Sequence, residues 1–363
     1  SINKKDNNDD GRQTHFFSNS NFDLENQIFD QSNLELKIEK TSNDNFISLY
    51  SLESTSPIIS DTSVLENKIE FIGETDDLFF ELSLESYETL NKKNSDRYEF
   101  VYPNYSLTKS INRENSLVNN IQFTSSGNQK TFSTNIYEAV QINNILLSSL
   151  NNISNLGYNN NFKTLIKNVN TDGKNSSKFK DNTQSEILTL FAYDIDFPLI
   201  KEFKNTKNFL TPKISLRYSP NDTKSLINET RLLNTDNIFS LNRIGFDETV
   251  EGGASLTVGL DFDKKRKDTN DTFFSSKIAT VFREQENENL PVTSTLNKKQ
   301  SDFVGEIVLN PLSNFKFSYN YLIDSHLNKV NLHSFENKFI VNNFVNTFTF
   351  YEENNLIGNN SYY

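Results

Sequence analysis

Apolar and polar residues alternate along most of this chain of 363 residues, which is the pattern of half-buried β-strands. Successive side chains of a strand point to opposite faces, so each such run has one apolar face and one polar face. The clearest runs are LELKIEK (34–40), LFFELSLES (78–86), ISLRYS (214–219), SLTVGLDF (255–262) and FKFSYNY (315–321). Their recurrence from one end of the chain to the other predicts an all-β, antiparallel protein.

Polar clusters separate these runs, and they are typical of turns: 41–45, 91–96, 170–177 and 284–289. The chain has only 11 Gly and 7 Pro, so Asn, which tolerates positive φ, is expected to form many of the turns. We find no strict repeat and no boundary, and therefore expect a single domain over residues 1–363. One segment, 139–153, leaves helix and strand open, because its apolar residues also follow a helical spacing: Ala139, Ile142, Leu146 and Leu150.

Two architectures fit a long antiparallel meander. One is a soluble sandwich or β-solenoid, and the other is an outer-membrane β-barrel whose apolar face contacts lipid and whose polar face lines a lumen. Three features favour the transmembrane barrel. The apolar faces draw on 31 Phe and 14 Tyr, the polar faces are strongly charged, and the mean hydropathy is only −0.61. No run approaches the ~18 consecutive apolar residues of a membrane helix.

The barrel interpretation assigns an orientation to two strands by parity alone. In the strand 315–321, the rings are expected to face lipid, and they are Phe315, Phe317, Tyr319 and Tyr321. The residues between the rings, Lys316, Ser318 and Asn320, are expected to face the lumen together with Lys213, Ser215 and Arg217 of the strand 214–219 region. Each of these six residues could instead be a purely structural part of the barrel wall, without a functional contact.

Composition and motifs exclude several classes of function. The net charge of −12 argues against nucleic acid as a partner, because phosphates need a basic surface, and the absence of Cys makes disulfides impossible. The three histidines lack metal-ligand spacing, and an acidic turn at 6–11 has Phe17 where a calcium loop needs Glu. No hydrolase or nucleotide-binding motif is found. We therefore predict no catalytic residue, no cofactor and no metal site.

Five segments, taken in order, carry a resemblance to a known family: TSNDNFISLYSL (41–52), DFPLI (196–200), FLTPKISLRYSPN (209–221), NIFSLNRIGFDETVEGGASLTVGLDF (237–262) and FREQENENLPVTSTLNKKQSDFVGEIVLNP (282–311). They resemble the C-terminal barrel domain of the LptD family, the lipopolysaccharide-assembly proteins also called organic solvent tolerance proteins. The resemblance covers about residues 10–363 and is most specific from Asn237 to Asp324. The strand FKFSYNY directly follows the last of these segments.

This resemblance implies a transport protein that is not an enzyme. Members of the family are multi-pass β-barrels of the Gram-negative cell outer membrane, surrounded by outer-membrane lipid. They receive lipopolysaccharide from a periplasmic Lpt bridge protein and insert it into the outer leaflet through a polar lumen and a lateral seam. A plug lipoprotein, LptE, occupies much of that lumen. The resemblance implies the same partners for this chain.

The chain also departs from the family pattern. The periplasmic jelly-roll domain that would contact the bridge protein and the closing strands of the barrel are both expected to be absent, so we expect an incomplete fragment of a large barrel. Two other functions stay open at this point. One is a general porin or transport barrel, and the other is a secreted β-rich adhesin or binding module.

Overall fold

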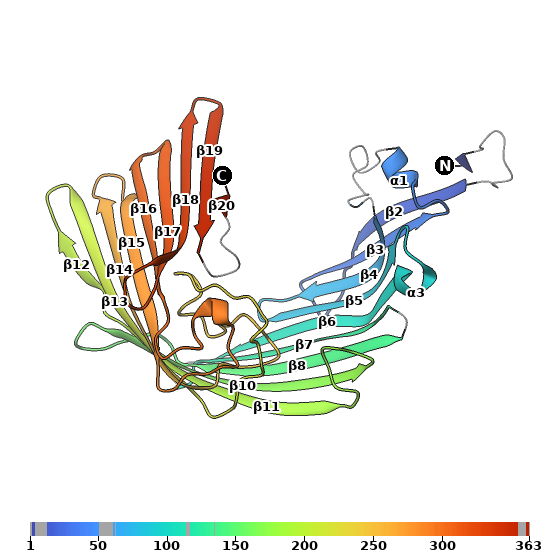
Figure 1. Ribbon diagram of the computed structural model, residues 1–363, viewed down its shortest axis with the longest axis horizontal. Helices are drawn as coiled ribbons and strands as arrows, with labels where there is room; N and C mark the ends of the chain where they lie inside the picture. Colours follow the sequence, from blue (N-terminus) through green and yellow to red (C-terminus); the bar gives the residue numbers. More distant parts are fainter. Residues whose placement is uncertain are drawn as a thin grey trace. The chain divides into compact units, whose positions relative to one another are not determined.

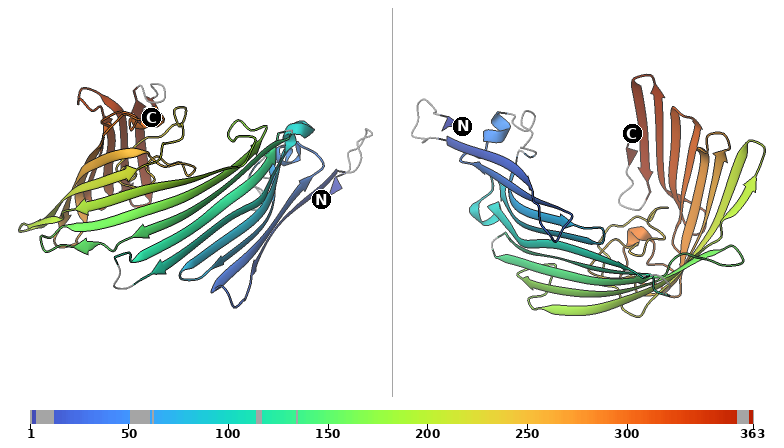
Figure 2. Two further views of the ribbon diagram at one scale, coloured as in Figure 1. Left: turned by 90° about the horizontal axis from the view of Figure 1, so that it is seen from below. Right: turned by 180° about the vertical axis from the view of Figure 1, so that it is seen from behind.

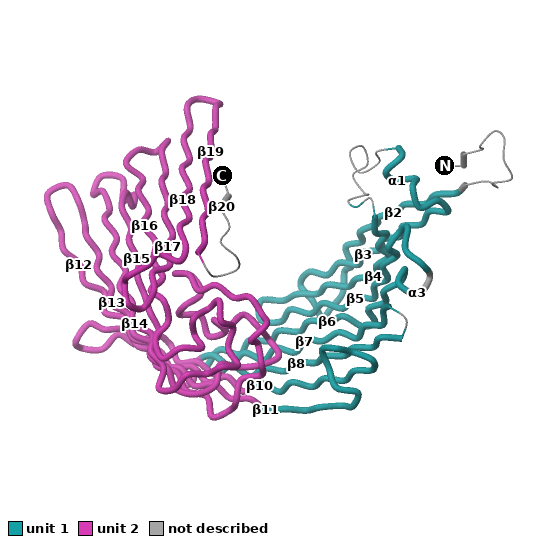
Figure 3. Tube along the Cα trace, viewed as in Figure 1, with its two compact units in different colours: residues 1–113, 120–146, 167–187 teal, residues 114–119, 147–166, 188–363 magenta. Residues whose placement is uncertain are grey.

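The computed structural model describes seven parts of the chain: residues 2–3, 13–50, 61, 63–113, 117–133, 135–354 and 361–362. The acidic turn expected at 6–11 lies outside these residues. The chain forms two compact units, shown in Figure 3: unit 1 comprises residues 1–113, 120–146 and 167–187, and unit 2 comprises residues 114–119, 147–166 and 188–363. Since compact units of this kind can belong to one domain, the single domain over residues 1–363 stays a prediction.

Unit 1 is an antiparallel meander in which each strand pairs with the next along the chain. Its strands are β1 (Ile2–Asn3), β2 (Gln13–Asp23), β3 (Gln31–Thr41), β4 (Val64–Glu74), β5 (Leu78–Thr89), β6 (Tyr98–Asn112), β7 (Asn120–Phe132) and most of β8 (Ile136–Ser148). Two short helices lie in its connections, α1 (Phe46–Leu49) and α3 (Asn94–Arg97). The ambiguous segment 139–153 is thus mainly strand, because it falls largely within β8.

Unit 2 continues the same pattern, and Figures 1 and 2 show its strands side by side in chain order. Its strands are β9 (Asn152–Ile153), β12 (Leu199–Glu202), β13 (Thr206–Ser219), β14 (Gly253–Arg266), β15 (Thr272–Arg283), β16 (Phe303–Leu312), β17 (Phe315–Ile323), β18 (Val330–Val341), β19 (Phe344–Glu353) and β20 (Ser361–Tyr362). Two further strands, β10 (Asn159–Lys174) and β11 (Gln184–Asp196), have residues in both units. All register pairings within the unit are antiparallel.

The connections of unit 2 differ strongly between the two ends of its strands. Short turns join the strands at one end, at 267–271, 313–314 and 342–343. At the other end, two long loops follow β13 and β15, comprising residues 220–252 and 284–302. The second long loop contains the 3₁₀ helix η1 (Val292–Ser294). The strands therefore form a plain up-and-down meander with all of its long connections at one end.

One face of each unit exposes apolar side chains. On β13, Ile214, Leu216 and Tyr218 are 39%, 48% and 52% exposed, whereas the intervening Ser215 and Arg217 are buried. In unit 1, alternate residues of β3, β4 and β5 behave in the same way, and they include Ile38, Ile69 and Leu84. A soluble protein rarely leaves so large an apolar surface in contact with water. The burial pattern thus agrees with a sheet whose apolar face is solvated by lipid.

The buried core of unit 2 lies on the opposite face, beneath the two long loops. The loops contribute apolar side chains that pack on residues of β15, β16, β17 and β18 near the ends of these strands. The fully buried members include Ile238, Leu290, Leu296, Val281 and Val304. The polar cluster 284–289, predicted to form a turn, lies at the start of the second loop. Both loops are folded segments that contribute to this core.

The fold is therefore all-β and antiparallel, as predicted. No helix of the described residues is long and apolar enough to cross a membrane.

Candidate functional site: a buried arginine–glutamate network

The strand register places all six polar candidates on one face of unit 2. One row of directly paired residues runs Lys213, Gly259, Ala279, Val304 and Leu322 across β13 to β17. Because side chains alternate along each strand, the residues two, four or six positions away from this row share its face. These are Ser215 and Arg217 on β13, and Ser318, Asn320 and Lys316 on β17. The two long loops cover part of this same face.

The six residues differ in what they contact. Ser215 donates a hydrogen bond of 2.5 Å to Oδ1 of Asp194, and Lys213 forms an ion pair with Asp261. Arg217 is buried, and its guanidinium donates to three backbone carbonyls of the first loop, those of Phe239 (2.9 Å), Ser240 (2.6 Å) and Leu241 (3.3 Å). Ser318 is buried, whereas Lys316 and Asn320 are exposed. Arg217 is thus a residue that holds the loop against the strands.

The rings of the strand 315–321 lie on the other face, in contact with the next two strands. Tyr319 stacks on Phe335 of β18 with their ring centroids 4.5 Å apart, and Phe335 lies 5.8 Å from Phe350 of β19. Phe317 is also close to Phe335, at 6.1 Å. The phenol of Tyr319 shares a hydrogen bond of 2.8 Å with Nδ1 of His333. These rings form a continuous aromatic patch on the face opposite the loops.

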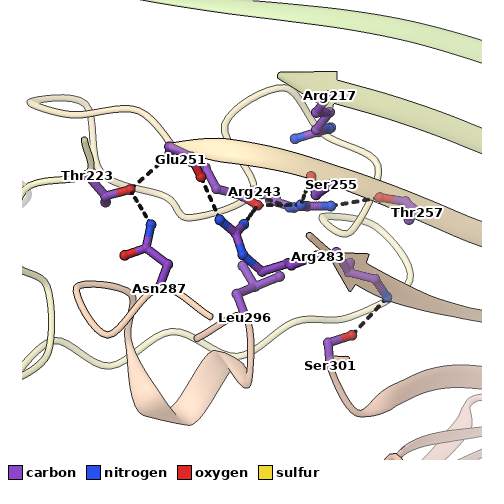
Figure 4. Close-up of polar contacts among 12 residues, drawn as sticks. Arg217, Thr223, Arg243, Glu251, Ser255, Thr257, Arg283, Asn287, Leu296 and Ser301 are labelled. Carbon is purple, nitrogen blue, oxygen red and sulfur yellow. Dashed lines mark hydrogen bonds and ion pairs between the residues drawn. The ribbon is translucent and has the colours of Figure 1, made fainter. Parts of the chain in front are cut away.

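A network of buried charges joins the first loop of unit 2 to strands β14 and β15 (Figure 4). Arg243 has no exposed side-chain surface, and its guanidinium binds both carboxylate oxygens of Glu251, at 2.6 and 2.5 Å. Its remaining donors reach the hydroxyls of Thr257 (2.7 Å) and Ser255 (2.9 Å) on β14. The loop residue Arg243 is therefore tied both to the loop end and to the strand that follows it.

A second arginine joins this network from β15. Arg283 donates to the same carboxylate of Glu251 and to the backbone carbonyl of Gly252, the latter at 2.5 Å. The two glycines that follow Glu251 make this approach possible. Gly252 lies so close to Asn221 that a Cβ would clash with the backbone there, and Gly253 has a φ of +81°, which favours glycine. The segment EGG (251–253) thus places one carboxylate between two arginines.

Further polar contacts fasten the two loops to each other. The hydroxyl of Thr223 accepts hydrogen bonds from the N–H of Gly252 (2.8 Å) and from Asn287 of the second loop (3.0 Å). The hydroxyl of Thr293 accepts from the N–H of Arg231 (2.8 Å) and donates to its carbonyl (3.1 Å). The two loops consequently form one folded cap on the polar face of unit 2, which we call the loop cap.

The charges explain why Glu251 stays ionised although it is buried. Burial alone raises the pKa of this carboxyl, but the charge and hydrogen bonds of Arg243 and the charge of Arg283 outweigh it and lower the pKa from 4.5 to about 2. The guanidinium of Arg243 uses its donors on Glu251, Thr257 and Ser255 of the protein itself. The network is a fastening for the loop cap rather than a reaction centre.

The polar face of unit 1 is also charged. Lys68 bridges Glu35 (2.8 Å) and Glu70 (3.1 Å), and Lys37 bridges Glu66 (2.6 Å) and Glu39 (3.3 Å). These residues lie on β3 and β4, on the face opposite Ile38 and Ile69. Charged side chains in such a row need contact with water or with an opposite charge, because burying an isolated charge costs much free energy. Both units thus combine an apolar face with a charged or polar one.

Sequence analysis missed the network of Arg243, Glu251 and Arg283. Its residues were nevertheless within the quoted segments, where an Arg, an acidic residue and two Gly precede a strand and another Arg opens a loop. That local pattern was visible, but nothing in it showed that these side chains meet.

The network makes a prediction for the variant Glu251→Gln, which removes the negative charge between two buried arginines. Because breaking a buried pair leaves an uncompensated charge, we expect a loss of about 3–5 kcal/mol in the free energy of unfolding, measured by denaturant titration. The control is Glu286→Gln, an exposed position in the second loop that should change stability by less than about 0.5 kcal/mol. Equal effects of the two substitutions would contradict the fastening role.

The lowered pKa of Glu251 predicts a dependence on pH. Since the pKa is about 2 in the folded protein and 4.5 as the ordinary value, the ionised carboxylate contributes stability above about pH 4.5, and this contribution is lost as the pH falls towards 2. The measurement is the difference in unfolding free energy between the wild type and Glu251→Gln at several pH values. This difference should shrink between pH 4.5 and 2, and a constant difference would refute the assignment.

Comparison with known proteins places the chain in a family. The family model described as LptD, LPS transport system D, matches residues 11–362. The search of curated proteins found no match. The matched range includes the strands from β2 to β20, the loop cap and the aromatic patch. The chain therefore belongs to the LptD family, whose members are non-enzymatic β-barrel proteins of the outer membrane that transport lipopolysaccharide.

Proposed function

We propose that this protein receives lipopolysaccharide on the periplasmic side and inserts it into the outer leaflet, with the polar faces of its strands lining the route of the sugars. The match to the LptD family over residues 11–362 carries this proposal. Lipopolysaccharide is an amphiphile, so its sugars need a polar path while its acyl chains stay out of water. A wall with one charged face and one apolar face offers both environments.

The two faces divide the candidate residues accordingly. Lys213, Ser215, Arg217, Lys316, Ser318 and Asn320 would face the lumen. Phe315, Phe317, Tyr319 and Tyr321 would face lipid, together with the exposed apolar residues of β13 and β14. The support is the register, which keeps each set on one face across several strands. Because unpaired backbone groups are costly in lipid, the strands also need the continuous pairing that is seen here.

The lengths of the connections suggest which end of unit 2 faces the cell exterior. Outer-membrane barrels have short periplasmic turns and longer extracellular loops. The long loops 220–252 and 284–302 would then lie on the outside, and the turns 267–271, 313–314 and 342–343 would face the periplasm. The loop cap folds back on the polar face from the outer end, so sugars would meet it on their way out. We infer that they leave sideways, through a seam between strands, and not straight through the cap.

The partners of this route follow from the family. We propose a plug lipoprotein of the LptE type in the lumen and a periplasmic Lpt bridge protein that delivers lipopolysaccharide through an N-terminal domain of the full-length protein. The charged faces of unit 1 and unit 2 are the surfaces that a plug would contact. The ion pairs between β3 and β4, such as those of Lys37 and Lys68, make this surface strongly charged.

The proposed orientation is tested by placing an arginine on each face of unit 2. Leu260 lies near the middle of β14 on the apolar face, and Asn320 lies near the middle of β17 on the polar face. For the full-length protein in lipid vesicles, Leu260→Arg should lower the free energy of unfolding by about 2–4 kcal/mol, and Asn320→Arg by much less. Equal losses at the two positions would show that the apolar face does not contact lipid.

Depletion of the full-length protein in cells tests the transport function. We expect lipopolysaccharide to disappear from the cell surface and to return when the wild-type gene is supplied in trans. Surface labelling of lipopolysaccharide is the measurement, and uptake of small solutes is the control. Unchanged surface lipopolysaccharide together with reduced solute uptake would favour a porin and refute the assembly role.

A further inference from the structure

A shallow hollow interrupts the apolar face of unit 1. It has a volume of about 300 Å³, which is at the lower end for small-molecule sites. Strands β6, β7, β8 and β10 contribute to it, and its lining includes Tyr105, Tyr137, Gln141, Asn170 and Asp172. We call it the tyrosine hollow. Its lining combines these polar and aromatic residues with small apolar ones such as Ala139 and Val140.

The register shows that the tyrosine hollow opens on the apolar face. Tyr105 pairs directly with Leu82 of β5 on one side and with Gly127 of β7 on the other. Leu82 is an exposed member of the apolar face. Gly127 forms the floor, because a Cβ at this position would lie 2.7 Å from the carbonyl oxygen of Val140 and 2.9 Å from Cε1 of Tyr105. The missing side chain leaves room beside the ring.

A ladder of amides and hydroxyls supports the hollow from below. The hydroxyl of Ser125 lies 3.2 Å from that of Tyr105 and donates to Oδ1 of Asn143 at 2.7 Å. Asn143 in turn donates to Oδ1 of Asn168 (3.1 Å), which also accepts from Asn170 (2.7 Å). These hydrogen bonds cross from β6 through β7 and β8 to β10. They hold Asn170 in place at the edge of the hollow.

Several polar groups of the hollow remain available for a ligand. Within the part of the chain that the structure describes, the side chains of Tyr137, Gln141 and Asp172 form no hydrogen bond or ion pair. A tyrosine ring, an amide and a carboxylate beside each other offer a stacking surface with donors and acceptors around it. This combination suits the hydroxyl groups and the ring faces of a sugar. An acyl chain would leave these polar groups unsatisfied.

The position of the hollow along the strands also indicates that it lies outside the hydrocarbon interior of the membrane. Further along the same strands and on the same face lie Phe123, Ile145 and Ile166, all exposed. Unsatisfied polar groups in hydrocarbon are costly, so the apolar residues mark the membrane interior and the hollow marks its border. The longest connection of unit 1, 42–63, is at the end of the strands nearest the hollow, whereas the short turn 75–77 is at the other. By the rule of long extracellular loops, this border is the outer one.

We infer that the tyrosine hollow binds the saccharide part of a lipopolysaccharide molecule in the outer leaflet, on the outside of the wall. The inference rests on the proposed orientation of the strands. The hollow would thus contact lipopolysaccharide after this lipid has reached the outer leaflet, and not while it passes through the lumen. Because this site lies on the apolar face, it is separate from the polar residues that would line the lumen.

The test uses the full-length protein in phospholipid nanodiscs that contain no lipopolysaccharide. The probe is the core oligosaccharide released from lipopolysaccharide by mild acid, and binding is followed by saturation-transfer NMR. We expect transfer to the sugar in the wild type. Loss of one aromatic contact corresponds to a factor of about five or more in the dissociation constant. Tyr137→Ala should therefore weaken binding at least about fivefold. Asn170→Ala removes the adjacent amide and Ala139→Trp fills the hollow, so both should weaken binding as well.

The matched control is Tyr218→Ala, an exposed tyrosine on the apolar face of β13 that should leave binding unchanged. Equal binding by the wild type and all three hollow variants would overturn the inference, as would absence of binding or equal affinity for a neutral dextran of the same length. The assay requires no transport. Loss of surface lipopolysaccharide on depletion without oligosaccharide binding would therefore refute only this inference, and binding without an effect of depletion would refute only the transport role.

Discussion

The alternation of side chains along a β-strand is the constraint on which the rest of this structure depends. A strand with two accessible faces needs two different surroundings, and a shift of one residue in register would exchange them completely. In unit 2, such a shift in β13 would move Arg217 into the surroundings of Leu216 and Tyr218. The apolar and polar faces of the strands and the short turns between them specify the observed register.

The loop cap adds a second layer of specification to this sheet. A loop that folds over a polar face needs partners for its own backbone, and Arg217 supplies three hydrogen bonds to consecutive carbonyls. A buried ion pair such as Arg243 with Glu251 adds little net stability compared with well-packed apolar residues. It does, however, penalise every alternative position of the loop in which one charge would lose its partner. The network is thus better explained as a device that fixes the loop in one place.

The faces of the strands were predictable from sequence because they depend only on parity, as the positions of Ser215 and Tyr319 show. The family was predictable from the order of several segments, and the match over residues 11–362 confirmed it. The secondary structure of the segment 139–153 was not predictable, because the spacing of Ala139 and Ile142 fits a helix equally well. Pairing with the neighbouring strands makes this segment a strand. The contact between Glu251 and Arg283 joins residues with no periodic relation, so only the folded chain reveals it.

The loop cap and the tyrosine hollow are two places where the alternation of polar and apolar faces is broken, in opposite ways. The loop cap puts an apolar core, with residues such as Val281 and Val304, on the face that is polar elsewhere. The tyrosine hollow puts amides and a carboxylate on the face that is apolar elsewhere. Proteins tend to depart from consistent local rules at functional sites, where another interaction compensates. For the loop cap that compensation is visible as packing. For the hollow, part of it is the ladder of hydrogen bonds among its amides and hydroxyls, and the proposed saccharide would supply the rest.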